Sequence, residues 1–310
     1  MKVRSSLFVV AIAVLGAASC NDSKIVAGAS CPTGGSAASI APQHSAPRPG
    51  IGAFHPSSSA NATASDATPA SAAQILAAMD VDFAVTDVSL RDDPMQAAAF
   101  NGLGDLHAVA GPSFAFLSTG VAGSGTSKAL DPSAFLAQPG EDLSSPGCDA
   151  NTFDCVQLAF SFVVPDNAHS LAFDFNFMST EFPEFVNLGY NDSFKVSMSS
   201  ASNNYDNLVF DHQNHPINID NAFFNQPCGE LTGTGYDQMD PFAGTCDAGG
   251  TGLLTTQAPV APGETVTLTF SVFDSGDGVY DSAVMIDNVR FDNSTVSTPN
   301  TDPCTGAATN

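Results

Sequence analysis

The chain has few basic residues and no tryptophan. Its 310 residues contain 8 Lys and Arg against 32 Asp and Glu, which gives a formal net charge of −24. This balance argues against nucleic acid and anionic lipid surfaces as partners, because both are polyanions. It suits a soluble exported protein and the binding of divalent cations. The absence of Trp argues against a sugar-cleaving cleft, where aromatic rings commonly stack on the substrate.

Several catalytic signatures are also missing. The chain has no Gly-x-Ser-x-Gly elbow, and no Cys-x-x-Cys or Cys-x-x-His pair that would indicate zinc. Residues 273–276 (Phe-Asp-Ser-Gly) imitate an aspartic-protease signature, but that chemistry needs a second such aspartate, and no second copy exists. His212 and His215 lack the Glu of a zinc-protease motif, and Pro216 disfavours a helix there. We therefore predict no catalytic residues.

The first twenty residues predict export and lipidation. Lys2 and Arg4 precede a short apolar stretch, and residues 17–20 (Ala-Ala-Ser-Cys) resemble a bacterial lipobox, with Ala17 where Leu is usual. The apolar stretch is too short to span a membrane. We predict a signal peptide over 1–19 and a lipid on Cys20, with plain secretion as the alternative. Loss of Lys2 and Arg4 would leave 6 basic against 32 acidic residues, or −26.

Lipidation would place the protein at the bacterial cell envelope, with the outer membrane or cell surface as the expected location. The lipid would be its only contact with the membrane. Residues 21–22 (Asn-Asp) leave the choice between the inner and the outer membrane open.

The cysteine count favours disulfides. With Cys20 lipidated, six of the seven cysteines remain, and an even number in an exported protein is typical of disulfide pairing. Cys148–Cys155 and Cys228–Cys246 are the simplest pairs, because their members lie close together in the sequence. Cys31–Cys304 would then join the two ends of the chain. Fifteen connectivities are open to six cysteines, so these three pairs are a hypothesis.

The rest of the chain divides into a tether, one domain and a tail. Residues 20–70 are rich in Ala, Ser and Pro and predict a flexible tether, because they cannot bury enough apolar surface to fold. Residues 71–292 predict one domain that begins with a short helix at 71–79, and 293–310 predict a loose tail.

Within that domain, apolar and polar residues alternate, for example over 170–177 and 265–273. This period of two predicts strands with one face packed and one face exposed to water. The expected fold is therefore an all-β, antiparallel two-sheet β-sandwich, jelly-roll-like, with a core dominated by the 23 Phe residues.

Two acidic loops follow strand-like runs, over 181–192 and 274–281. Crowded carboxylates repel one another unless they lie in water or share a cation. Gly276 and Gly278 allow the second loop to curl so that its oxygens converge, although an ordinary Asp/Gly turn is the alternative for that loop alone. Glu184 and Asn187 are expected to face solvent. We predict a structural Ca²⁺ ion held by oxygen ligands from both loops: Glu181, Asn191, Asp192, Asp274, Asp277 and Asp281.

These segments resemble the choice-of-anchor L domain of bacterial surface proteins. Residues 179–186 (Ser-Thr-Glu-Phe-Pro-Glu-Phe-Val), 190–194 (Tyr-Asn-Asp-Ser-Phe) and 274–284 (Asp-Ser-Gly-Asp-Gly-Val-Tyr-Asp-Ser-Ala-Val) are similar to three motifs of that family, and residues 116–120 (Phe-Leu-Ser-Thr-Gly) to a fourth. The chain departs from the pattern at Thr180, where the family has Glu, which removes one candidate ligand, and at Phe182, where it has Tyr.

The resemblance implies a β-rich, surface-displayed module over residues 73–292, with no defined biochemical activity. A lipid on Cys20 would then be the anchor of this member. We predict a non-enzymatic module that binds a polysaccharide or a surface protein in adhesion or recognition, and no nucleic acid. Two alternatives stay open at this point: a secreted hydrolase of cell-surface polymers, using Glu181, Glu184 or an Asp of the 274–281 loop, and a purely structural envelope component.

Overall fold

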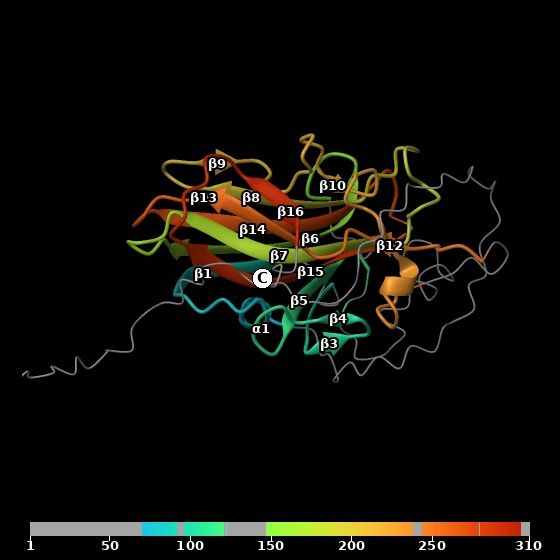
Figure 1. The fold of residues 1–310 in the computed structure, drawn as a ribbon, viewed down its shortest axis with the longest axis horizontal. Helices are drawn as coiled ribbons and strands as arrows, with labels where there is room; N and C mark the ends of the chain where they lie inside the picture. The colour runs from blue at the N-terminus through green and yellow to red at the C-terminus, as the bar shows by residue number, and fades with distance from the viewer. Residues whose placement is uncertain are drawn as a thin grey trace, which may run out of the picture.

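Two antiparallel sheets lie face to face in the computed structural model, which describes residues 70–91, 96–120, 122, 147–237, 244–278 and 280–304 (Figure 1). The first sheet has the order β1-β6-β14-β8-β10, and β9 also pairs with β8. Its strands are β1 (Val85–Arg91), β6 (Thr152–Val163), β8 (Ser193–Ser199), β9 (Asn204–Tyr205), β10 (Ile217–Asn218) and β14 (Thr265–Ser275).

The second sheet has the order β11-β12-β7-β15-β5-β2, and β13 lies between β7 and β16. Its strands are β2 (Ala97–Phe100), β5 (Phe114–Ser118), β7 (Ser170–Ser179), β11 (Gln226–Pro227), β12 (Gly249–Gly250), β13 (Leu254–Pro259), β15 (Ser282–Asp292) and β16 (Asn300–Pro303). A separate hairpin, β3 (Gly102–Leu103) and β4 (Leu106–His107), and a 3₁₀ turn, η1 (Cys228–Glu230), complete the elements. The predicted all-β sandwich with one short helix is confirmed.

The helix, α1 (Ala72–Ala78), closes the side of the sandwich where β1 and β2 lie. Ser71 caps its N-terminus: the Ser71 hydroxyl accepts from the Gln74 N–H at 3.4 Å, and the Gln74 side chain accepts from the Ser71 N–H at 2.9 Å. This reciprocal pairing satisfies two backbone donors that a helix start leaves open. Ile75 and Met79 are fully buried and join the main core. The helix therefore covers one edge of both sheets.

Phenylalanine fills the space between the sheets, as predicted. Phe270 of β14 lies with its ring centroid 5.0 Å from that of Phe173 on the opposite sheet. It also stacks beside Phe160 at 6.0 Å and Phe194 at 6.4 Å within its own sheet. Offset and edge-to-face aromatic pairs of this kind add to the free energy gained from burial alone.

The alternating pattern of β7 was misleading about its environment. We expected one face in water, but every residue of β7 is buried. At the end of β7 a second apolar cluster covers the outer face, where Met178 packs with Leu103 and Leu106 of the β3–β4 hairpin and with Leu231 and Tyr236 from the segment after η1. The second sheet is therefore packed on both faces along β5, β7 and the first half of β15, whereas β13 and the first sheet alternate between buried and partly exposed residues.

Burial of this outer face places a polar network inside the molecule. Asp174, on the outer side of β7, accepts hydrogen bonds from Thr255 Oγ1 at 2.7 Å and Asn288 Nδ2 at 2.6 Å. Arg290 completes an ion pair with this carboxylate: its Nη1 donates to Asp174 Oδ2 at 3.1 Å and its Nη2 donates to Asp174 Oδ1 at 3.3 Å. A buried carboxylate is stable only when its oxygens are paired in this way. Asp174 thus shows how this protein satisfies a buried acid that has a structural role.

Part of the expected loose tail is a strand. β16 pairs with the edge of β13, and the buried hydroxyls of Thr256 and Thr301 are 2.8 Å apart. The pairing satisfies the free edge of β13, which the polar sequence of 293–310 gave no reason to expect. Residues 305–310 and the predicted signal peptide and tether, including Cys20, lie outside the described residues.

Two predicted disulfides are confirmed. Cys148–Cys155 and Cys228–Cys246 are bonded, each with a Cα–Cα distance of 5.5 Å. Cys304 is also disulfide-bonded. The other half of the predicted Cys31–Cys304 pair lies outside the described residues, so that pairing stays a prediction.

Candidate cation site

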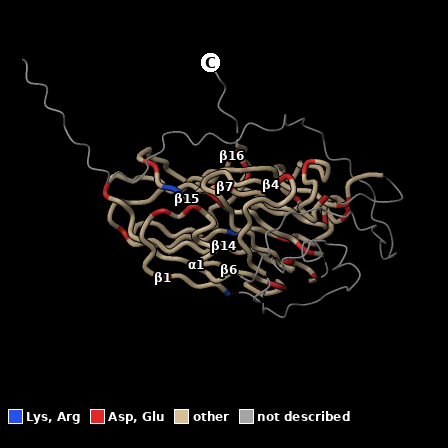
Figure 2. Tube along the Cα trace, turned by 90° about the horizontal axis from the view of Figure 1, so that it is seen from below, with Lys and Arg blue, Asp and Glu red and all other residues tan. Residues whose placement is uncertain are grey.

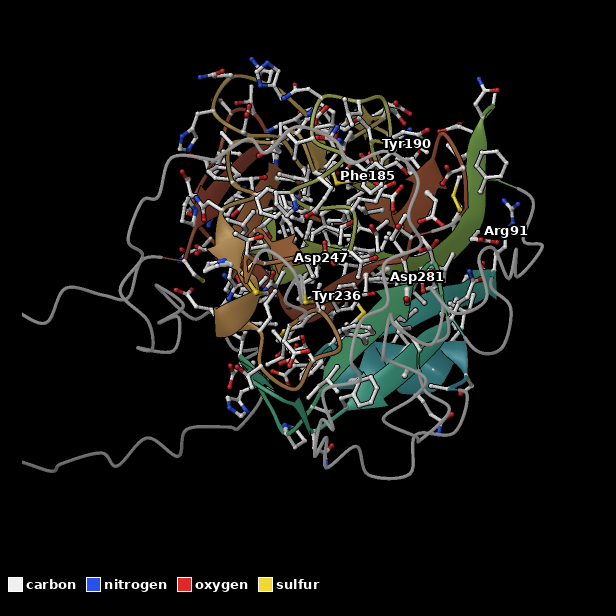
Figure 3. All side chains as sticks on the ribbon, turned by 90° about the vertical axis from the view of Figure 1, so that its right-hand side faces the viewer. Arg91, Phe185, Tyr190, Tyr236, Asp247 and Asp281 are labelled. Carbon is white, nitrogen blue, oxygen red and sulfur yellow. A yellow bond between two sulfur atoms is a disulfide. The ribbon has the colours of Figure 1, made fainter. Side chains whose placement is uncertain are left out.

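The two acidic loops lie side by side at one end of the sandwich. The 180–192 loop leaves β7 in the second sheet and enters β8 in the first, and the 276–281 loop returns from β14 in the first sheet to β15 in the second. Ser282, at the start of β15, pairs with Ser179, at the end of β7, and Phe273 of β14 pairs with Ser193 of β8. Both crossings therefore occur at the same end, which faces the viewer in Figure 3.

Asp192 joins the loops directly. Its Oδ1 accepts from the Ser275 N–H at 3.0 Å, and its Oδ2 accepts from the Ser282 hydroxyl at 2.7 Å. Thr180 adds a second connection, since its N–H and its hydroxyl both donate to the Asp281 carbonyl at 3.2 Å. The coupling of the two loops, which spacing alone could only suggest, is thus a property of the fold.

Four of the predicted ligands gather where these loops meet. Glu181, Asp192 and Asp274 are each 1% exposed, and Asp281 is partly exposed. Both oxygens of Asp274 are buried without a hydrogen-bond partner, as are Glu181 Oε2 and Asp281 Oδ2. Unpaired buried acceptors are costly and rare in folded proteins. The nearest ionisable partner of Asp274 is another acid, Asp192, whereas Asp174 is paired with Arg290. The acidic group therefore lacks the cationic partner that Asp174 has.

Burial raises the pKa of each of these four carboxyls, and the charges of neighbouring carboxylates add to the shift for Glu181, Asp274 and Asp281. Burial, followed by the charge of Asp192, raises the pKa of Glu181 to about 10. Burial raises the pKa of Asp192 to about 7, although hydrogen bonds, that from Ser282 first, oppose the shift. Burial and nearby carboxylates also raise the pKa of Asp274 and of Asp281 well above the ordinary range. The group is therefore stable only when protons or another cation neutralise it.

Two of the described basic side chains, Lys195 and Arg290, are paired with other acids. Lys195 pairs with Asp149 and Asp206, and Arg290 pairs with Asp174. Figure 2 shows how few Lys and Arg residues there are beside the many Asp and Glu residues.

The other two predicted ligands lie at the edge of this group. The side-chain amide of Asn191 lies against Asp220: with its nitrogen assigned to face the acceptors around it, it donates to Asp220 Oδ2 at 2.7 Å and to the Tyr190 carbonyl at 3.2 Å. Asp277 is partly exposed, and its charge helps to raise the pKa of Glu181. Glu184, which we expected to face solvent, is only partly exposed, because it lies in the compact turn that the 181–186 segment forms.

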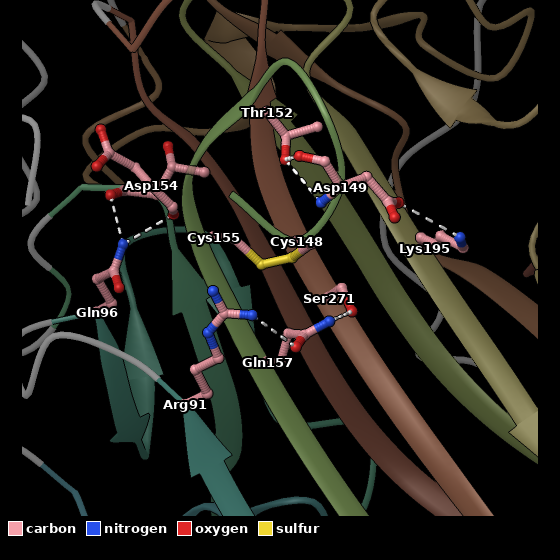
Figure 4. The surroundings of a disulfide bond; sticks show 11 residues. Arg91, Gln96, Cys148, Asp149, Thr152, Asp154, Cys155, Gln157, Lys195 and Ser271 are labelled. Carbon is pink, nitrogen blue, oxygen red and sulfur yellow. Dashed lines mark hydrogen bonds and ion pairs between the residues drawn. A yellow bond between two sulfur atoms is a disulfide. The ribbon is translucent and has the colours of Figure 1, made fainter. Parts of the chain in front are cut away.

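Asp154 belongs to the group and was missed in the sequence. It is 2% exposed, and its charge is a leading cause of the raised pKa of Asp281. A bulge in β6 opposite β14 brings it there, where its φ of +45° lies in the left-handed region. The neighbouring Cys148–Cys155 disulfide and the Gln96 side chain, which donates to the Asp154 carbonyl at 2.9 Å, hold this bulge (Figure 4). The sequence feature that could have drawn attention to Asp154 is its position next to Cys155, in a short loop that a predicted disulfide closes.

Tyr236 was missed as well, because nothing in its local sequence connects it to the acidic loops. It is 3% exposed, and burial, followed by the charge of Asp281, raises the pKa of its hydroxyl. Its ring lies close to Asp281 in Figure 3. An aromatic side chain thus limits the access of water to the carboxyls.

The carboxyl groups do not yet surround one point. Among the described residues, no group of three or more His, Cys, Asp or Glu side chains is arranged to hold a metal ion. An ion would have to draw the side chains together by rotation, and it would take further oxygens from the loop backbone. The calcium site thus stays a prediction, and the structure contributes the buried, unpaired oxygens.

The family follows from a comparison with known proteins. The model of the choice-of-anchor L domain matches residues 74–292, which include the sandwich and both acidic loops, so the chain belongs to this family. Membership implies a surface-associated protein of bacteria, in a family that is not known for enzymatic activity. No curated protein matches the chain.

None of the described helices has the length and hydrophobicity needed to cross a membrane.

Proposed function

We propose that this protein is a lipid-anchored, non-enzymatic recognition module of the bacterial cell surface, whose sandwich is closed at one end by a calcium ion. The ion would be held between the 181–192 and 274–281 loops. The module would bind an extracellular or envelope ligand, a polysaccharide or a surface protein, and so act in adhesion. One observation carries the cation site: Asp274 is buried with both of its carboxyl oxygens unpaired.

The donor set fits calcium chemically. Only oxygen atoms are available, from Glu181, Asp192, Asp274 and Asp281, with Asp154 beside them. Ca²⁺ accepts six to eight oxygen ligands in flexible geometry, whereas Mg²⁺ demands a near-ideal octahedron. Loops joined by hydrogen bonds but not yet converged on one point suit the more tolerant ion. The ion would supply positive charge to a group whose nearest ionisable neighbours are other acids.

Terbium luminescence tests the site directly. Tb³⁺ replaces Ca²⁺ in oxygen sites, and tyrosine can sensitise its emission when the two are close. Because the chain lacks Trp and Tyr236 lies beside Asp281, we expect tyrosine excitation to give terbium emission that calcium abolishes by competition. Asp274→Asn should remove most of this emission, and the exposed Asp166→Asn should leave it unchanged. Equal emission from the two variants would place the bound ion elsewhere.

The anchor is tested through Cys20. A lipid chain gains roughly 0.8 kcal/mol for each buried methylene, which gives stable attachment when several chains are present. We expect the full-length precursor to fractionate with membranes and to incorporate labelled palmitate, and Cys20→Ala to be released in soluble form. Membrane fractionation of Cys20→Ala would contradict lipidation as the anchor.

Asp277→Asn separates the module from the hydrolase alternative. Asp277 is partly exposed at the edge of the acidic group, as a catalytic acid would be. For a recognition module we expect no turnover of cell-surface polymers by either the original protein or the variant. If the original protein degraded such a polymer and the variant lost this activity at an unchanged melting temperature, the hydrolase alternative would replace our proposal. The purely structural alternative predicts neither turnover nor ligand binding.

A further inference from the structure

Three aromatic rings form a continuous surface beside the acidic loops, which we call the aromatic rim: Phe185, Tyr190 and Tyr280. The Phe185 ring centroid lies 5.4 Å from that of Tyr190, nearly perpendicular to it, and 5.1 Å from that of Tyr280. All three side chains are partly exposed. Gly276 allows the second loop to pass close by, since a Cβ there would lie 3.0 Å from the Tyr190 ring. The rim therefore joins both loops at the surface.

The rim concentrates residue types that are scarce elsewhere. The chain has 4 Tyr, of which Tyr190 and Tyr280 belong to the rim. Leu188, which is 44% exposed, precedes Tyr190 in the same loop, and Phe153, which is 39% exposed, lies beside Gly278 of the other. Exposed apolar groups together with tyrosine are typical of binding surfaces.

Negative charge surrounds the same rings. Glu184 precedes Phe185 in the chain, and Asp277 lies three residues before Tyr280. Asp247 lies near the rim in Figure 3. The charges of Asp247, Glu184 and Asp277 all raise the pKa of Tyr280, after burial as the first cause. The side chains of Glu184, Asp247 and Asp277 are all partly exposed and place negative charge around Tyr280.

We propose that the aromatic rim binds a positively charged peptide segment of a partner protein, with Lys or Arg side chains over the rings of Phe185, Tyr190 and Tyr280. This rests on the proposed function as a recognition module and names its partner. Lys and Arg are attracted to aromatic faces, and carboxylates around the rings add charge complementarity. Because the chain is strongly acidic, it attracts basic partners and repels acidic ones. A neutral glycan would use the rings but would gain nothing from Glu184, Asp247 and Asp277.

A titration with synthetic peptides tests the proposal. The probe is a short peptide that alternates Lys and Gly, compared with the same peptide carrying Glu in place of Lys, and with a neutral oligosaccharide. The measurement is tyrosine fluorescence of the full chain in saturating calcium, with calorimetry as a check. We expect saturable binding of the Lys peptide only, and weaker binding as salt rises, because ions screen exposed charges.

Two variants locate the binding. Tyr280→Ala and the double variant Glu184→Gln/Asp247→Asn should each weaken Lys-peptide binding about tenfold, which corresponds to about 1.4 kcal/mol. The control Asp87→Asn/Asp166→Asn removes the same charge from exposed positions on other parts of the surface and should change the affinity less than twofold. Calcium binding of each variant, followed by terbium competition, reports whether the sandwich is intact.

The outcomes are distinct. Equal loss of affinity in the control and the rim variants would mean general charge attraction and would overturn the proposal. Binding of the oligosaccharide in place of the Lys peptide would also overturn it and would favour glycan recognition at the rim. If calcium binding persists and no peptide binds, the partner proposal fails while the proposed cation site stands.

Discussion

Removal of calcium is expected to lower the free energy of unfolding of this protein by about 3–4 kcal/mol. A ligand that binds only the folded state stabilises it by about 2.7 kcal/mol at roughly 100 times its dissociation constant, and by about 4.1 kcal/mol at roughly 1,000 times. For a domain of this size, each kcal/mol shifts the melting temperature by roughly 2–4 °C. A thermal melt with EDTA, and then with excess calcium, should therefore show a difference of about 6–15 °C.

Asp274→Asn provides the sharpest form of this experiment, because it keeps the shape of the side chain and removes one buried charge. We expect two opposite effects. In EDTA the variant should be at least as stable as the original protein, because folding no longer requires a carboxyl at this position to take up a proton or to be ionised beside Asp192 and Asp281. In calcium the variant should be less stable, because an anionic ligand is missing.

The control is Asp166→Asn, which changes an exposed residue and should follow the original protein in both conditions. Identical melting temperatures of the original protein with EDTA, calcium, magnesium and manganese would refute a structural cation. A variant that is destabilised equally in EDTA and in calcium would show that Asp274 has a packing role only.

The second large effect is the dependence of stability on pH when calcium is absent. The pKa of Glu181 rises from 4.5 in the unfolded chain to about 10 in the folded protein, and that of Asp192 rises from 3.8 to about 7. A raised carboxyl pKa means that the folded state holds its proton more tightly than the unfolded state. The resulting stabilisation is complete below about pH 4 and is lost as pH rises, by about pH 7 for Asp192 and about pH 10 for Glu181.

We therefore expect the calcium-free protein to lose stability on the order of a few kcal/mol between pH 5 and pH 9. Calcium should reverse this trend, because it competes with protons for the same oxygens and binds the ionised form. The rise in melting temperature on adding calcium should thus be larger at pH 8 than at pH 5. Melting curves at several pH values, with and without calcium, measure both effects.

Below about pH 4 the stability of the calcium-free protein should instead fall as the pH decreases. Burial tends to raise the pKa of Asp211, but hydrogen bonds, chiefly from the backbone N–H groups of His215 and Gln213, lower it below its usual value of 3.8. A hydrogen bond from the His212 side chain likewise lowers the pKa of Asp302. Stability from these groups is present above about pH 4 and is lost as pH falls through their folded pKa values. Maximal stability of the calcium-free protein is therefore expected near pH 4. Stability that rises steadily from pH 5 to pH 9 without calcium would contradict the protonated acidic group.

Much of the fold could be predicted because strand patterns are local. The runs at 170–177 and 265–273 became β7 and β14, and the 71–79 segment became α1, with Ser71 as its cap. Two local cysteine pairs were also correct, since short spacings make them the simplest choices. The strand β16 was missed because Asn300–Pro303 has no apolar alternation, and its only reason to be extended is the open edge of β13.

The candidate site was predicted in part. Glu181, Asp192, Asp274 and Asp281 come together, and they could be found because the loops that carry them are crowded with acids. Asp154 could not be grouped with them, since it reaches the site through a bulge of a strand that is distant in sequence. Asn191 has the right side chain and lies beside Asp192, but its amide turns to Asp220, and spacing does not determine such a rotation.

The sequence alone determined the all-β character of this protein, its acidic surface and the segments in which carboxylates crowd, because periodicity, charge and loop composition are local properties. Only the tertiary structure decided that both faces of β7 are covered, that the two acidic loops meet, and that Asp274 is left buried with unpaired oxygens. These facts depend on which surfaces pack together and exclude water. Packing between distant segments therefore turned two charged loops into one candidate cation site.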